Sequence, residues 1–252
     1  MKRTRDERKR NIKLTIRYDG TAYVGWQRQK NGVSVQEVIE KTLRNIVGER
    51  VCLIGAGRTD SGVHARSQTA NFRTRSRLAP ERIKRALNSR LPEDIAISGV
   101  DEVATGFHAQ FSARGKRYRY TILNSDARDP FLRRFAAYYP YRLGLSAMRK
   151  AARYLVGRHD FRTFQNAGAG RKSTVRAVRK IAIAKNGPLI YIDIEADGFL
   201  YNMARNIVGT LMEVGRGKKN AVSVKAALSR KDRAYCGPTA PAHGLCVMKV
   251  LY

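Results

Sequence analysis

The sequence predicts an α+β protein made of two comparable halves. Apolar and polar residues alternate in some segments, as in half-buried strands, and recur at helical spacing in others. Over the first hundred residues these segments follow the order β-α-β-β-α-β, which occurs in many RNA-binding folds. We expect a basic, disordered arm at residues 1–10, a first half at 11–106 and a second half at 107–252.

The first half opens with an alternating segment at residues 12–18, which predicts a strand. Ser34 and Glu37 have the spacing of a capping box, so we expect a helix that begins there and continues to Val47. Pro80 is typical of the first turn of a helix and predicts a second one. The other expected strands lie at residues 52–54, 68–73 and 95–100.

The second half is predicted to contain a hairpin, because residues 175–184 and 189–196 alternate on either side of Asn186-Gly187-Pro188. We expect its loop to have about three residues or more. The remaining expected elements are strands within 111–123 and at 245–251, helices at 146–156, 201–214 and 223–228, and a loop from residue 234 into the last strand.

The charge of the chain points to a polyanionic partner. Its 252 residues include 50 Lys and Arg against 20 Asp and Glu, a formal charge of +30. Nucleic acid is the first candidate, because Lys and Arg neutralise phosphates. An anionic membrane surface is the second, but no segment predicts an amphipathic helix with a bulky apolar face opposite a basic one. No run of about 18 apolar residues is present, so we expect no membrane span.

The cysteines and histidines indicate neither a disulfide framework nor a metal site. The three cysteines are widely spaced and the four histidines form no two-histidine helical motif. The N-terminus lacks the apolar run of a secretory signal. A reducing cytoplasm is therefore the simplest expected location.

The most informative segment for chemistry is GAGRTDSGVH at residues 55–64. Its glycines permit sharp turns, but it matches neither the Walker nor the dinucleotide-binding glycine pattern. Arg58 and Asp60 are two residues apart and would point to one side of an extended backbone. A nearby guanidinium favours an ionised carboxylate, the state that a nucleophile or general base requires. A turn aspartate with a local ion pair remains the alternative.

Two further segments carry candidate residues. In KRYRY at 116–120, Tyr118 and Tyr120 would share one face of a strand and the arginines the other, so stacking on an unpaired base and phosphate contact are possible uses. A buried tyrosine face with a solvated basic face is the alternative. Arg205 lies in an apolar helix start, where a charge is costly unless it is paired or its head reaches water.

Together these residues resemble the tRNA pseudouridine synthases of the TruA type. The similar segments follow one another along nearly the whole chain and leave only the basic arm outside. They are YDGTAYVGWQRQ (18–29), SVQEVIE (34–40), GAGRTDSGVHA (55–65), FHAQFSARGKRYRY (107–120), HDFRTF (159–164), FLYNMARNIVG (199–209) and HGLCVMKVLY (243–252).

The resemblance implies a fold and a set of roles. The halves would be ferredoxin-like, or RRM-like, with joined sheets, helices outside and an active-site cleft between them. Asp60 would be the nucleophile, and Tyr118 would stack on the target uracil. Arg205 would pair with Asp60, Arg58 would contact RNA and help extrude the base, and Leu245 would pack in the pocket wall.

The implied reaction converts uridines 38, 39 and 40 of the tRNA anticodon stem-loop to pseudouridine, by a homodimer without cofactor or metal. Attack at uracil C6, attack at ribose C1′ and a glycal route all remain open. So do preference among the uridines and the role of the arm. A binding module without turnover fits the charge but not an aspartate in a basic groove. A metal nuclease would need clustered carboxylates, which the sequence around Asp60 lacks.

Overall fold

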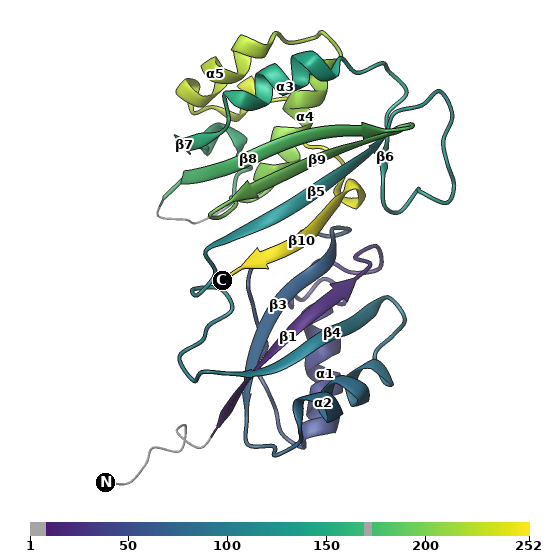
Figure 1. Ribbon diagram of the computed structural model, residues 1–252, viewed down its shortest axis with the longest axis vertical. Helices are drawn as coiled ribbons and strands as arrows, with labels where there is room; N and C mark the ends of the chain where they lie inside the picture. Colours follow the sequence, from purple (N-terminus) through teal and green to yellow (C-terminus); the bar gives the residue numbers. More distant parts are fainter. Residues whose placement is uncertain (1–8, 169–172) are drawn as a thin grey trace. The chain divides into compact units, whose positions relative to one another are not determined.

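The computed structural model describes residues 9–168 and 173–252, which form two compact units (Figure 1). Unit 1 contains the described residues up to Arg114 together with Val247–Tyr252, and unit 2 contains Gly115–Cys246. The division into halves between residues 106 and 107 stays a prediction. The predicted arm lies mostly outside the described residues, but its last residue, Arg10, is the first of a strand and pairs with Glu102.

Unit 1 is built on an antiparallel sheet. Its central strand, β1 (Arg10–Tyr18), pairs with β3 (His64–Thr74) on one side and with β4 (Ile95–Val103) on the other. The short β2 (Ile54–Gly55) pairs with β3, and the end of β10 (Leu245–Leu251) lies beside β3. The alternating apolar residues of β1 are fully buried, as the period of two predicts.

Two helices pack on the same side of this sheet (Figure 1). Helix α1 (Val35–Val47) begins as the capping pattern predicts, because Ser34 accepts a hydrogen bond from the Glu37 amide at 3.3 Å. It ends at Gly48 in the left-handed conformation. Helix α2 (Pro80–Asn88) has its proline in the first turn, which confirms that prediction as well.

In unit 2, antiparallel strands follow the order β5-β9-β8-β7. The strands are β5 (Gly115–Leu123), β7 (Gly157–Asp160), β8 (Val175–Asn186) and β9 (Leu189–Ala196), with β6 (Ala137–Tyr138) parallel to β5. The helices are α3 (Leu145–Arg153), α4 (Met203–Gly215) and α5 (Ala221–Arg230), with single 3₁₀ turns at Arg162–Phe164, Arg233–Tyr235 and Ala242–Gly244. Helices α3 and α4 pack together, and α4 is buried along most of its length.

The α+β prediction is therefore confirmed, with some details corrected. The hairpin of unit 2 closes with two residues, because Asn186 pairs with Leu189 and Gly187 has φ +55°, which a tight turn needs. The expected strand at 52–54 is reduced to β2. The strand expected within 111–123 begins only at Gly115, because residues before it form turns. Whether the two sheets join, and whether a cleft lies between the halves, stays a prediction.

No helix in the described ranges is long and apolar enough to cross a bilayer.

Candidate active site

Asp60 lies in unit 1, in the loop between β2 and β3. Its side chain is half-buried, and its carbonyl accepts a hydrogen bond from Val63 N at 3.2 Å, which closes a turn. Gly62 within this turn has φ +76°, so the glycine expected from the sequence is needed here. Arg58 lies two residues earlier and is exposed.

The loop is fixed on both sides of Asp60 by the segment that follows β1. Trp26 N donates to Thr59 O at 3.1 Å, and the Tyr18 hydroxyl and Thr59 Oγ1 are 2.9 Å apart. On the other side, Ser61 Oγ donates to Tyr23 O at 3.1 Å. The residues before and after Asp60 are therefore each held, which leaves the backbone of Asp60 little freedom.

Two glycines allow this close approach. A Cβ at Gly25, which has φ +109°, would lie 2.4 Å from Thr59 O. A Cβ at Gly20 would lie 2.0 Å from Val63 O. Both positions accept only glycine, because a side chain would push the loop away.

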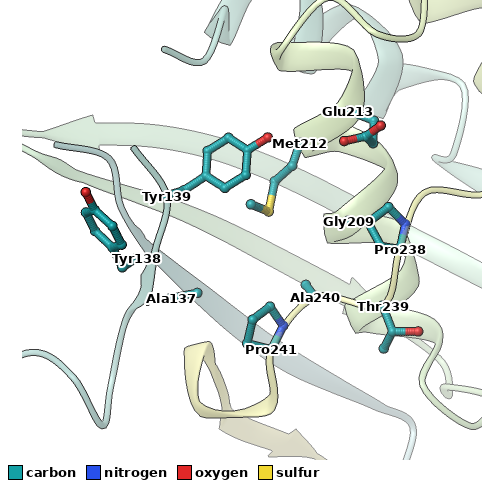
Figure 2. Close-up of a pocket in the computed structure, with 10 residues that line it drawn as sticks. All are labelled: Ala137, Tyr138, Tyr139, Gly209, Met212, Glu213, Pro238, Thr239, Ala240 and Pro241. Carbon is teal, nitrogen blue, oxygen red and sulfur yellow. The ribbon is translucent and has the colours of Figure 1, made fainter. Parts of the chain in front are cut away.

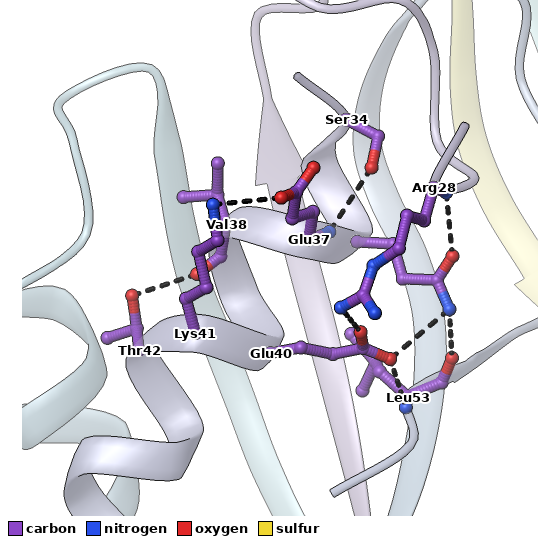
Figure 3. A network of polar contacts seen from close by, with 9 residues as sticks. Arg28, Ser34, Glu37, Val38, Glu40, Lys41, Thr42 and Leu53 are labelled. Carbon is purple, nitrogen blue, oxygen red and sulfur yellow. Dashed lines mark hydrogen bonds and ion pairs between the residues drawn. The ribbon is translucent and has the colours of Figure 1, made fainter. Parts of the chain in front are cut away.

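A buried carboxylate anchors the same region to α1 (Figure 3). Glu40 is 8% exposed, accepts from Leu53 N at 2.8 Å and from Gln36 Nε2 at 3.3 Å, and forms an ion pair with Arg28. Gln36 in turn accepts from Arg28 N at 3.0 Å and donates to Leu53 O at 2.9 Å. Through Leu53 the cluster joins α1 to the chain leading into β2. Through Arg28 it joins α1 to the segment that follows β1. The sequence pattern does not indicate this cluster, although Gln36 and Glu40 lie within the motif SVQEVIE.

Tyr118 lies in unit 2 on β5, where Tyr118 and Tyr120 are buried and Arg117 is exposed. This alternation confirms the predicted faces of the strand. The Tyr118 ring meets the Phe199 ring edge-on, with centroids 4.6 Å apart. Arg119 forms a bidentate ion pair with Asp193, in which Nε donates to Oδ1 and Nη2 donates to Oδ2, each at 2.8 Å. The Arg119 guanidinium is thus already engaged in an ion pair on the surface of the sheet, and is not an unpaired group available for phosphate.

Arg205 lies in the first turn of α4. Its Nε donates to Ala240 O at 2.8 Å, and its Nη1 donates to Asn202 Oδ1 at 2.9 Å. The Ala240 amide donates back to Arg205 O at 3.2 Å. Asn202 has φ +59°, a conformation that asparagine adopts more readily than most residues.

Leu245 is the first residue of β10 and is buried. The preceding Gly244 packs on Tyr120, and a Cβ there would lie 2.6 Å from Tyr120 Cζ. The Tyr120 hydroxyl donates to Pro241 O at 2.8 Å. Burial raises the pKa of this phenol well above its ordinary value, so the hydroxyl keeps its proton and remains a donor at neutral pH.

The candidate residues therefore fall into two groups. Arg58 and Asp60 share one loop of unit 1, while Tyr118, Arg205 and Leu245 belong to unit 2. That these groups meet in one pocket, and the role of each residue, stay predictions. The described parts of the chain contain no group of three or more His, Cys, Asp or Glu placed to hold a metal ion.

Comparison with known proteins defines the class to which this fold and these residues belong. A family model described as "tRNA pseudouridine synthase" matches residues 14–112 and 151–252. The chain belongs to this family, so it is an isomerase that acts on tRNA.

Relatives are similar along nearly the whole chain. The chain is 48% identical over 243 residues to tRNA pseudouridine synthase A of Thermoanaerobacter sp. (strain X514), covering 96% of this chain and 100% of the relative. It is 45% identical, with the same coverage, to the protein of that name from Clostridium acetobutylicum. It is 46% identical to the one from Moorella thermoacetica, covering 96% and 99% of the two chains.

Proposed function

We propose that this synthase converts uridines 38, 39 and 40 of the tRNA anticodon stem-loop to pseudouridine, with Asp60 as the nucleophile. One observation supports the role of Asp60 above all others. The loop that carries it is held by hydrogen bonds at Thr59 and Ser61, on either side of a half-buried carboxylate. Pre-organisation of this kind suits a group that must meet one reacting atom.

The reaction exchanges one covalent bond to ribose for another and involves no net oxidation or reduction. The bond between uracil N1 and ribose C1′ breaks, and a bond between uracil C5 and C1′ forms. The proton on C5 leaves to water, and N1 gains a proton, so atoms and electrons balance. Asp60 has three possible points of action: uracil C6, ribose C1′ or the proton removed in a glycal route.

The other candidate residues complete the proposed site. Tyr118 stacks on the extruded uracil, which offsets part of the cost of removing a base from its helix. Arg205 pairs with Asp60, Arg58 contacts the RNA during extrusion, and Leu245 contributes an apolar wall. The charge of +30 holds the tRNA by its phosphates.

The proposed setting is a homodimer in the cytoplasm, with each tRNA contacting both subunits. The few, widely spaced cysteines support a reducing compartment. Light scattering with and without tRNA gives the oligomeric state, and cell fractionation gives the location. A monomer that modifies tRNA at the full rate would contradict the dimer.

Substrate position is tested with unmodified tRNAs that carry uridine at only one of 38, 39 or 40. Pseudouridine is mapped at nucleotide resolution after incubation with the wild type and with Asp60→Ala. We expect modification at each of these positions by the wild type and none by the variant, with tRNA binding retained. Modification only elsewhere in the tRNA would contradict the proposed target, while binding without modification by either protein would favour the binding module.

A further inference from the structure

In unit 2, α4 and the chain after α5 approach backbone to backbone. A Cβ at Gly209 would lie 1.7 Å from Pro238 O, and a Cβ at Gly237 would lie 2.6 Å from Gly209 O. Both positions therefore need glycine, because no side chain fits between the two segments. This contact lies about one helical turn beyond Arg205 on α4.

A buried polar cluster holds the two segments together. Asn206 is fully buried, and its Nδ2 donates to Phe164 O at 2.8 Å and to Asn166 Oδ1 at 2.9 Å. Its Oδ1 accepts from Thr239 Oγ1 at 2.7 Å and from Arg233 Nη2 at 3.2 Å. The amide thus uses both donors and both acceptor positions, and a buried network satisfied in this way specifies one geometry.

Arg233 extends the cluster along the segment. Its Nη1 donates to Gly237 O at 2.9 Å, its Nη2 to Thr239 Oγ1 at 3.1 Å and its Nε to Asn166 Oδ1 at 3.2 Å. The planar fork of the guanidinium fixes the directions of these donors at once. Arg233 therefore hydrogen-bonds to neighbouring residues of the same unit through each of its three nitrogens.

The segment is packed against α4 on one side and borders a pocket on the other. A cavity of about 270 Å³ lies against Thr239, Ala240 and Pro241, with Tyr139 and Met212 on its other walls (Figure 2). Side chains leave this space unfilled, so the polar contacts of Arg233 and Thr239 add to the backbone packing against α4 in setting the position of the segment.

Ala240 is the point at which the segment meets Arg205. Its carbonyl accepts from Arg205 Nε, and its amide donates to the Arg205 carbonyl. We propose that Thr239, Arg233 and Asn206 are positioning residues that fix the guanidinium of Arg205 through the Ala240 carbonyl. This inference rests on the proposed function, in which Arg205 pairs with Asp60.

A positioning role predicts loss of rate without loss of binding. If the Ala240 carbonyl shifts, Arg205 Nε loses its acceptor, and the bond from Nη1 to Asn202 Oδ1 no longer fixes the orientation of the guanidinium together with it. The tRNA is held mainly by its phosphates, so its affinity should barely change. The chemical step should slow, because small misplacements of a site group are costly in rate.

The hydroxyl of Thr239 gives the sharpest test. Thr239→Val keeps the shape and removes both hydrogen bonds, while Thr239→Ser keeps the hydroxyl. We expect Thr239→Val to lower kcat by about tenfold with the Kd for tRNA within about twofold of wild type. Thr239→Ser should retain the wild-type kcat. Equal kcat for Thr239→Val and wild type, or equal losses in both variants, would overturn the proposal.

Arg233→Gln repeats the test independently and serves if Thr239→Val does not fold. Its control is Arg230→Gln, which removes the same charge from the end of α5, where Arg230 is exposed near the Tyr235 ring. We expect only Arg233→Gln to lower kcat. A weaker Kd with unchanged kcat would show an RNA contact instead and would overturn the positioning role.

Arg205→Ala separates this proposal from the proposed function. If Arg205→Ala keeps the wild-type kcat, then the role assigned to Arg205 is wrong. If Arg205→Ala loses activity while Thr239→Val and Arg233→Gln keep it, then only the positioning proposal fails.

Discussion

Replacing Glu40 by Gln should destabilise unit 1 and loosen the chain leading to the Asp60 loop. The Oε1 atom of Glu40 accepts from Leu53 N and Gln36 Nε2, while Oε2 faces Arg28 Nη2. An amide oxygen can replace Oε1. The amide nitrogen must then face the Arg28 guanidinium, donor against donor.

The size of the expected loss in stability follows from these hydrogen bonds. One charged hydrogen bond is lost and two others change from charged to neutral acceptors, which together are worth about 2–4 kcal/mol. The Arg28 side chain is 56% exposed and can turn into water, which limits the cost. We therefore expect a loss of about 2 kcal/mol in the free energy of unfolding, or roughly 30-fold in the ratio of folded to unfolded unit.

The single tryptophan of the chain makes the assay local. Trp26 is buried in unit 1, and its carbonyl accepts from the Gln36 amide at 3.0 Å, so urea denaturation followed by its fluorescence reports on this region. Glu37→Gln is the matched control, because Glu37 lies on the same helix and forms an ion pair with the exposed Lys41. Equal urea midpoints for Glu40→Gln and Glu37→Gln would refute the reasoning.

Three other contacts can be tested by substitution or labelling. Gly25→Ala should abolish most activity, because the new Cβ would clash with Thr59 O and displace the Asp60 loop. It should also lower the free energy of unfolding, measured in urea, by about 2 kcal/mol or more, because φ at this position is positive. The hydrogen bond from Thr74 holds the pKa of Glu49 below its ordinary value, so Glu49 stabilises the fold above its unfolded pKa and loses this effect as pH falls through its folded pKa. The stability advantage of the wild type over Glu49→Gln, measured in urea, should shrink from pH 7 to pH 3. Burial raises the pKa of the Cys236 thiol to about 11, so iodoacetamide at pH 8 should label it only after unfolding, as peptide mass spectrometry would show.

Each of these three predictions has a control within the same protein. Gly48→Ala introduces a side chain at φ +73° with no atom within 4 Å, so it isolates the backbone strain from the clash at Gly25. Similar activity losses in both glycine variants would contradict the clash. A difference between wild type and Glu49→Gln that stays constant with pH would contradict the lowered pKa. The exposed Cys52 should be labelled in the folded chain, and labelling of Cys236 at the same rate would contradict its burial.

The elements of the fold were predictable where the pattern is local. The alternation in β1 and the Ser34 cap of α1 are each visible within a few neighbouring residues. The hairpin loop was wrongly predicted to be longer, because Asn186-Gly187-Pro188 contains turn residues and only the register shows that Asn186 still pairs with Leu189. The two-residue β6 carries too little pattern to be predicted at all.

The supporting contacts of the site could not be predicted, because they join residues far apart in sequence. Glu40 bonds to Leu53, which a helical pattern cannot indicate, and its burial is unusual for a carboxylate. Asn206 meets Thr239 across more than thirty residues. In both cases the motif identified the segment but not the contact, because burial and hydrogen-bond partners arise only when distant segments pack.

Enzyme-excess tritium release from C5-labelled uridine in tRNA tests most directly whether Asp60 performs the chemistry. Asp60→Asn keeps the shape of the side chain, and Asp101→Asn makes the same charge change at an exposed ion pair with Lys13. We expect the wild type and Asp101→Asn to release tritium at equal rates, and Asp60→Asn to bind tRNA without releasing any. Release by Asp60→Asn at the wild-type rate would contradict the assignment of Asp60 as the catalytic residue.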